Sequence, residues 1–188
     1  MKEKSNIADI DRSVYDIRDK ENDAYRMTAG LNPEIVETLS KEKNDPVWMQ
    51  QFRLQSLQIY NETPLPNWGP SLDGLNIDSI ATYVRPNTGM KNSWKDVPQD
   101  IKDTFDRLGI PQAERKNLAG VGAQYDSELV YHNVKQDVAA EGVVYLDMES
   151  ALKGEYADMV KKYFMKLVTP HDHKFAALHG AVWSGGSF

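Results

Sequence analysis

The histidines between residues 171 and 179 are the side chains whose type and spacing come nearest to a metal site. His171 and His173 flank Asp172, and His179 follows in the same short stretch. Alternate residues of a strand point to the same side, so His171 and His173 could bind Zn²⁺ or Fe²⁺ together if this segment were extended. Two imidazoles alone make a weak site, and the spacing fixes no third ligand. Because Pro170 precedes them, a solvated turn is the preferred interpretation, and we assign no metal ligand here.

A glycine-rich stretch, AGVGAQ (119–124), is the one candidate for a phosphate-binding loop. Gly120 and Gly122 could bring backbone N–H groups close to an anion. A phosphate loop needs a strand before it and a helix after it, whereas here a helix is expected before it and a strand after it. There is also no Gly-Lys-Ser/Thr step. We therefore interpret this stretch as a connector from a helix to a strand.

His132 and the acidic residues before it, Asp126 and Glu128, are candidates for acid–base chemistry. No Ser, Thr or carboxylate stands beside His132 in a recognisable triad motif, so a hydrogen-bonded structural histidine at a strand end is preferred. Asp126, Ser127 and Glu128 are better explained as a turn and cap cluster than as a carboxylate pair. We assign no catalytic and no cofactor-binding residue, and we expect that the chain is not an enzyme.

Several aromatic residues could stack on a ligand, but helical spacing and neighbouring prolines favour roles in the core and as loop anchors. A fraction of them could instead form a protein-binding face, because binding hot spots favour Trp and Tyr. These residues are Trp48, Phe52, Tyr60, Trp68 and Trp94.

Composition limits the function classes. The 188 residues contain no cysteine, which excludes disulfides, zinc–thiolate sites and thiolate ligation of a cluster by these residues. The net charge is −6, with Lys and Arg interspersed among Asp and Glu, so nucleic acid is not an expected partner. No run of apolar residues is long enough to span a membrane, and we expect no membrane partner and a cytoplasmic location.

The pattern of apolar residues and breakers predicts an α+β chain dominated by short helices. Asn32 and Pro33 start the first helix, with Ile35, Val36 and Leu39 on one face. Further helices are expected from Pro46 to about Tyr60, from Pro98 to Leu108, from Pro111 to about Leu118, from Val134 to Ala140, and from Glu149 to Leu167 with a weak point at Gly154. The expected strands cover 79–84, 122–131, 143–147 and 174–188.

The helix from Pro46 to Tyr60 should bury one face. Trp48, Met49, Phe52, Ser56 or Leu57 and Tyr60 are spaced at three and four, and Trp48 is expected to be well buried. Arg53, Gln55 and Gln58 are expected on the other faces of this helix, away from the buried one.

Long motifs carry a resemblance that spans about Tyr15 to Phe188. The most specific are WGPSLDGL (68–75), SWKDVPQDIKDTFDRLGIPQAERKNLAGVGAQYDSE (93–128) and GVVYLDMESAL (142–152). With them, the chain resembles the N-terminal portion of the SufB family, the iron–sulfur cluster assembly scaffold proteins of the SUF system. Motifs of this length are too specific to arise from composition.

Residues 1–30 are polar and rich in Asp, Lys and Glu, so we expect a flexible or weakly helical segment there. The resemblance implies a helical α+β domain over 31–170 and the start of a right-handed parallel β-helix over 171–188, with the β-helix itself absent from this chain. Because 174–188 has the pattern of a strand entering a sheet, we expect the chain to be an N-terminal piece of a longer protein. The resemblance further implies that the full-length protein works with the SufC ATPase and with SufD, and with sulfur donor proteins as further partners. It implies an iron–sulfur cluster, and reduced flavin as a candidate cofactor, for the full-length protein and not for this fragment.

Two alternatives stay open. The chain could be a free-standing acidic interaction module with no metal chemistry, or, as the weakest option, an enzyme that uses His171 and His173.

Overall fold

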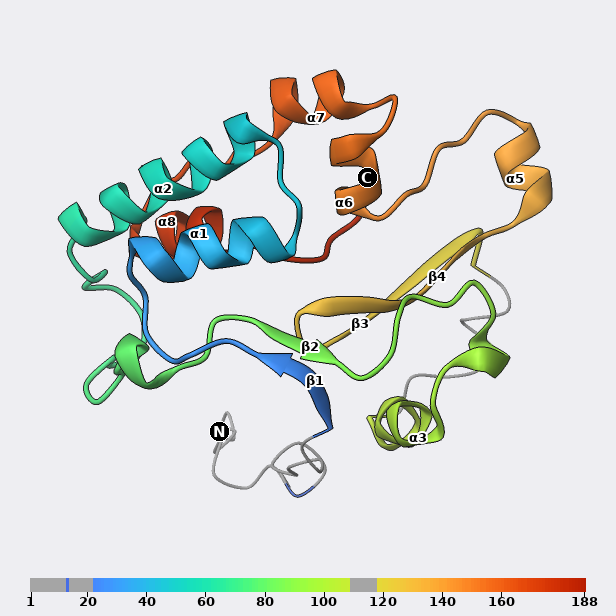
Figure 1. Ribbon diagram of the computed structural model, residues 1–188, viewed down its shortest axis with the longest axis horizontal. Helices are drawn as coiled ribbons and strands as arrows, with labels where there is room; N and C mark the ends of the chain where they lie inside the picture. Colours follow the sequence, from blue (N-terminus) through green and yellow to red (C-terminus); the bar gives the residue numbers. More distant parts are fainter. Residues whose placement is uncertain (1–12, 14–21, 109–117) are drawn as a thin grey trace, which may run out of the picture.

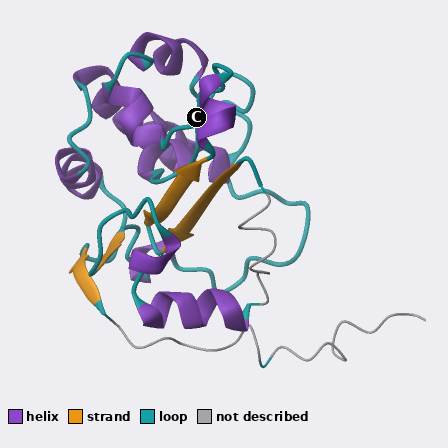
Figure 2. Cartoon of the chain, turned by 90° about the vertical axis from the view of Figure 1, so that its right-hand side faces the viewer, coloured by secondary structure: helices purple, strands orange, loops and turns teal. Residues whose placement is uncertain are grey.

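The computed structural model describes Ser13, residues 22–108 and residues 118–188. Within these ranges the chain is α+β, as the sequence predicts. Most of the helices gather in the upper part of Figure 1, and two small antiparallel sheets lie below them. The view turned by 90° shows the same division into a helical layer and a sheet region (Figure 2).

The first two helices, α1 (Pro33–Glu42) and α2 (Val47–Glu62), pack against each other. The predicted start of α1 is confirmed: the Asn32 side chain accepts a hydrogen bond from the Ile35 N–H at 3.0 Å, and Pro33 occupies the first turn. Ile35, Val36 and Leu39 are buried together, as their spacing predicts. The start of α2 differs in detail, because it has no side-chain cap.

The strand predicted over 174–188 is wrong. Residues Lys174–Val182 form the helix α8, which packs along α2. Small residues line the contact, and a Cβ at Gly180 would lie 2.5 Å from Ser56 Oγ, so glycine is what allows the two helices to approach so closely. The buried residues of α8 are Ala176, Ala177, Gly180 and Ala181.

After α8 the chain becomes extended and pairs internally. The Leu146 N–H donates to the Phe188 carbonyl at 3.0 Å, and the Phe188 N–H donates back to the Leu146 carbonyl at 2.9 Å. The predicted buried strand over 143–147 is therefore replaced by this short bridge, and Val143 and Val144 are exposed. The apolar residues of this run predict burial, but backbone pairing involves only its last residues, Leu146 and Asp147.

The first sheet pairs β1 (Asp23–Arg26) with β2 (Val84–Pro86), with Arg26 opposite Val84. The strand predicted over 79–84 is thus displaced, because Ile77–Ser79 forms a 3-10 turn, η2, capped by the Asn76 side chain. Pro86 is the last residue of β2. Strand β1 lies within 1–30, the range for which we expect a flexible or weakly helical segment; residues 1–12 and 14–21 of that range lie outside the described residues.

The second sheet is a hairpin of β3 (Gly120–Tyr125) and β4 (Glu128–Val134), which confirms the strand pattern over 122–131. Asp126 has φ of 52° and forms the turn, in agreement with the turn predicted for this cluster. Below the hairpin lie the 3-10 turn η3 (Trp94–Asp96) and the helix α3 (Gln99–Arg107). A core joins them, made of Val97, Ile101, Ala123, Val130 and Tyr131.

The remaining helices are α5 (Gln136–Ala140), α6 (Met148–Lys153) and α7 (Ala157–Tyr163). The weak point predicted at Gly154 is confirmed as a break between α6 and α7. The helix predicted from Val134 begins only at Gln136, because Asn133 and Val134 belong to β4; the Asn133 side chain donates to the Asn92 carbonyl at 3.0 Å. The helix predicted from Pro111 lies outside the described residues. In the described part of the chain, no helix has the length and apolar character needed to cross a bilayer.

Candidate functional site

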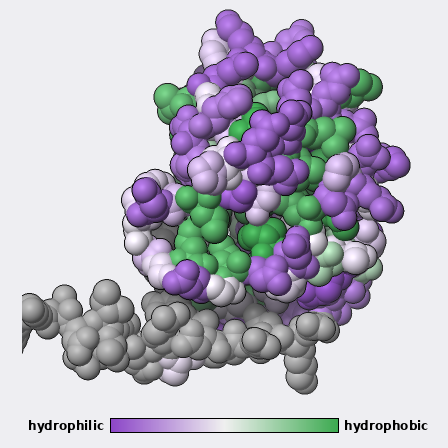
Figure 3. Space-filling model, turned by 90° about the vertical axis from the view of Figure 1, so that its left-hand side faces the viewer, coloured by the Kyte–Doolittle hydropathy of each residue, from purple (hydrophilic) through white to green (hydrophobic). Residues whose placement is uncertain are grey.

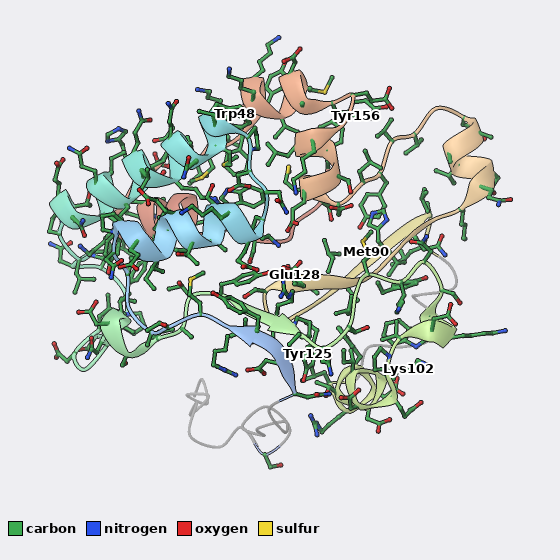
Figure 4. The ribbon with its side chains drawn as sticks, viewed as in Figure 1. Trp48, Met90, Lys102, Tyr125, Glu128 and Tyr156 are labelled. Carbon is green, nitrogen blue, oxygen red and sulfur yellow. The ribbon has the colours of Figure 1, made fainter. Side chains whose placement is uncertain are left out.

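A polar cleft of 300 Å³ lies where the helical layer meets the two sheets. Figure 4 shows Glu128 at this junction, below α1, with Met90 on a neighbouring loop. The cleft collects charges from segments far apart in the sequence. The charged residues that line it are Glu42, Lys43, Arg85, Glu128, Asp147, Glu149 and Lys153.

Lys43 forms the centre of this cleft. Its side chain is only 2% exposed, and its ammonium group forms ion pairs with Glu128, at 2.6 Å, and with Glu149. It also lies 5.3 Å from the centre of the Tyr83 ring. A buried ammonium is tolerated only when it is paired and hydrogen-bonded, and here one cation joins α1, β4 and α6.

The other groups in the cleft are also engaged. The Tyr83 hydroxyl donates to Glu128; burial, followed by this hydrogen bond and the Glu128 charge, raises the Tyr83 pKa above its usual range. Arg85 pairs with Glu42 at 3.1 Å, and Asp147 caps α6 by accepting from the Ser150 N–H at 2.9 Å. Among the described residues, the charged side chains named here contact one another or backbone groups, and Lys153 donates to the Lys43 carbonyl, so the cleft acts as an ionic junction.

A second buried charge pair holds the helical layer. Arg53, fully buried, donates through Nε to Asp45 at 2.6 Å and through Nη1 to the Trp183 carbonyl at 2.9 Å. Its guanidinium lies 4.7 Å from the centre of the Trp183 ring. Burial lowers the Arg53 pKa, while the charge and hydrogen bond of Asp45 act in the opposite direction. The prediction that Arg53 faces away from the core is therefore wrong. Its position four residues after Met49 is the signal that could have placed it inside.

The glycine-rich stretch is part of strand β3, which corrects its interpretation as a connector. A Cβ at Gly120 would lie 2.8 Å from the Tyr145 ring, and one at Gly122 would lie 3.1 Å from the Tyr145 hydroxyl. These glycines leave space for Tyr145.

His132 lies within β4 and stacks on Tyr145, with 4.5 Å between ring centres. Its Nε2 atom is buried and has no hydrogen-bond partner among the described residues, which differs from the hydrogen-bonded histidine expected from the sequence. Burial lowers the His132 pKa, with the nearby Asp147 charge opposing it. The ring serves as a packing element against Tyr145.

The histidine cluster does not form the extended pair that would share a metal. His173 caps α8, and its Nδ1 accepts from the Phe175 and Ala176 N–H groups, each at 3.2 Å. His171 lies in an exposed turn, as the preferred interpretation holds, and His179 lies on α8. Across 22–108 and 118–188, no group of three or more His, Cys, Asp or Glu is arranged to hold a metal ion.

The aromatic residues are mainly packing elements. Trp48 and Phe52 are half-buried against a core of Met49, Leu152 and Val160, and the Phe52 ring meets Phe164 edge-on at 5.4 Å. Tyr60 is also half-buried, and Trp94 packs on Phe105 and Tyr131. The expectation that Trp48 is well buried is thus only partly met.

Trp68 is the exception, because 65% of it is exposed. It anchors its loop with an edge-on contact to His173 at 5.8 Å between ring centres. The loop over 63–80 also exposes Leu65, Leu75 and Ile80. Figure 3, which shows the left-hand side of the molecule in Figure 1, has apolar side chains gathered between polar ones on that face.

Comparison with known proteins gives a consistent result. The chain is 51% identical over 182 residues to the iron–sulfur cluster assembly protein SufB of Bacillus subtilis (strain 168), covering 97% of this chain and 39% of that protein. It is 47% identical over 180 residues to an iron–sulfur cluster assembly SufBD family protein of Staphylococcus aureus (strain USA300), covering 96% of this chain and 38% of that protein. No family model matches the chain. The resemblance to SufB that the motifs indicate is confirmed, and the chain spans about two fifths of the length of these relatives.

Proposed function

We propose that this chain is the N-terminal portion of a SufB-like scaffold subunit that takes part in iron–sulfur cluster assembly with a SufC-type ATPase and a SufD-like subunit. The observation that carries the proposal is the 51% identity to a SufB protein over 97% of this chain. Identity of this extent is far beyond what a shared fold alone requires. Sulfur donor proteins are proposed as further partners, and the cytoplasm as the location.

Within such a subunit, this part acts as an accessory body and performs no catalytic step. The chain has no cysteine, so thiolate ligands for a cluster would come from elsewhere in the full-length protein. The iron–sulfur cluster and reduced flavin are accordingly proposed for the full-length subunit. A right-handed parallel β-helix is proposed to follow these residues.

The buried charges support a positioning role. Lys43 ties α1 to β4 and α6, and Arg53 ties α2 to the backbone after α8. Such paired buried charges favour one arrangement of the elements, because any other arrangement leaves a charge unpaired in the interior. A fixed arrangement of these helices and strands suits a scaffold subunit that must hold its partner proteins in a defined relative position.

A chimera tests the proposal directly. The segment of Bacillus subtilis SufB that aligns with this chain is replaced by this chain, and the chimera is expressed in cells depleted of their own SufB. We expect the chimera to restore the activity of an iron–sulfur enzyme such as aconitase and to co-purify with the SufC and SufD subunits. Unaltered SufB is the positive control.

A second chimera carrying Arg53→Ala is the control for destabilisation of this part, and it gives the enzyme activity and subunit retention expected when the segment folds poorly. If the first chimera accumulates as a folded protein but restores no activity and retains neither subunit, the proposal is wrong. The free-standing acidic interaction module then becomes the better explanation.

A further inference from the structure

The end of α7 and the turn after it expose a group of large apolar side chains. Leu167 is 95% exposed, and Tyr163 is 61% exposed. Met159 and Val168 are also exposed. Burying one such side chain is worth about 1.5–3 kcal/mol, so leaving several of them in water is costly unless a partner covers them.

The turn that presents these side chains has an unusual backbone. Met165 has φ of 47°, in the left-handed region that residues other than glycine seldom adopt. The Lys166 N–H donates to the Tyr163 carbonyl at 3.2 Å and closes the turn. Strained backbone of this kind tends to persist at functional positions, because a more relaxed loop would not present the same side chains.

Beside the exposed group lies a hollow of 410 Å³ between the turn and α8. Apolar and aromatic side chains line most of it, among them Tyr163, Met165 and Phe175, while Lys166, His173 and His179 supply its polar atoms. The hollow is large enough to accept one or two apolar side chains from another molecule.

The charge of this region is opposite to that of the protein. From Met159 to His171 the chain carries Lys161, Lys162 and Lys166 and no carboxylate, whereas the whole chain has a net charge of −6. Within the described ranges these three lysines form no ion pair. Lys162 lies 5.0 Å from the centre of the Tyr163 ring, and Lys161 lies 6.0 Å from that of Trp48.

We infer that residues 159–171 and the adjoining hollow form a docking surface for an acidic amphipathic segment of a partner protein. An apolar side chain of that segment enters the hollow beside Leu167, and its carboxylates lie over Lys161, Lys162 and Lys166. This is the helix-in-groove mode of recognition, in which apolar anchors supply affinity and opposite charge supplies orientation and association rate. We choose an acidic segment as the occupant because its carboxylates complement the three lysines of this surface.

The inference goes beyond the proposed function and does not depend on it. The surface comprises the end of α7, at the top of Figure 1, the turn after it and the hollow beside α8, and it shares no lining residue with the ionic junction around Lys43. Figure 4 shows Trp48 at the start of α2, close to α7. Loss of this surface should therefore leave the fold unchanged.

Fluorescence anisotropy on the full chain tests the inference. The probe is a fluorescein-labelled synthetic helix of glutamate, leucine and phenylalanine at amphipathic spacing, with a version carrying lysine for glutamate as the peptide control. We expect saturable binding of the acidic peptide that weakens as salt is raised. Lys166→Glu and Leu167→Ser should each raise the dissociation constant about ten-fold.

Matched variants at exposed positions outside the hollow and its neighbouring loop control for charge and apolar area. Lys95→Glu and Val143→Ser should leave the dissociation constant unchanged, and circular dichroism should show all four variants folded. No binding at millimolar peptide, or equal weakening by the control variants, overturns the inference. So does binding of the same surface to phosphatidylserine vesicles but not to peptide, which would make a membrane the partner. A dimer of this chain that Leu167→Ser dissociates would also overturn it, because the occupant would then be a second copy.

Discussion

Replacing Arg53 by alanine should lower the free energy of unfolding by about 3–5 kcal/mol. The substitution removes the cation that faces Asp45, whose side chain is only 1% exposed. It also leaves the carbonyls of Ala181 and Trp183 without their donor, and each unsatisfied buried group costs about 1–3 kcal/mol. Water that enters the space left by the guanidinium would hydrogen-bond to some of these groups and recover part of the lost stability. The summed cost of the lost ion pair and the two carbonyls is therefore an upper bound on the change in unfolding free energy.

Urea denaturation followed by tryptophan fluorescence measures this loss. Gln55→Ala, at an exposed position of the same helix, is the control and should change stability by less than about 0.5 kcal/mol. Asp45→Ala should be as damaging as Arg53→Ala, and the double variant should cost clearly less than the sum. If Arg53→Ala costs less than about 1 kcal/mol, the buried pair does not stabilise the helical layer and the reasoning is refuted.

Four further results are expected. Trp48→Ala should cost about 1–3 kcal/mol in urea denaturation, because the side chain is only half-buried; a loss above about 4 kcal/mol would contradict its placement. Gly120→Ala should destabilise by about 1–3 kcal/mol because its Cβ would meet the Tyr145 ring, and Tyr145→Ala in the same chain should relieve part of that loss; additive costs would argue against the contact. Deleting 174–188 should lower the melting temperature by many degrees, since this segment packs on α2; better solubility with unchanged melting would show that it is not part of the core. Burial lowers the His132 pKa in the folded chain, so the unfolded chain binds a proton at this histidine more readily. The contribution of His132 to stability is therefore complete above about pH 6.5 and is lost as the pH falls below that value. In urea denaturation at a series of pH values, His132→Phe should flatten this part of the stability profile, and an unchanged profile would count against the lowered pKa.

Local signals account for what the sequence predicts well. Asn32 and Pro33 set the start of α1 because an amide cap and a fixed φ act within one turn. Gly154 breaks the long helical region into α6 and α7, and Asp126 marks the hairpin turn. Each of these features depends on residues that are close neighbours in the chain.

Long-range contacts account for what it misses. Gly180 and the small residues before Trp183 have a pattern that fits a strand, and the packing of these residues along α2, with Gly180 next to Ser56, is a long-range contact that the local pattern does not reveal. Arg53 would be costly inside without Asp45 and the Trp183 carbonyl, and periodicity alone does not reveal those partners.

The ionic junction around Lys43 also depends on long-range contacts, so the sequence does not predict it. Lys43 and Glu128 are 85 positions apart, and Lys43 also pairs with Glu149 on a third element. No motif spacing links them, because the fold and not the local sequence brings them together.

The close contact of α2 with α8 has a consequence for the order in which the molecule forms. Arg53 and Trp183 are separated by 130 positions, so the helical layer cannot close until nearly all of these residues have been synthesised. Until then α2 exposes Met49 and Leu57 beside a charged side chain whose carbonyl partners have not yet been made. We expect the growing chain to depend on chaperones during this interval, and the docking of α8 to be the last step in closing the helical layer.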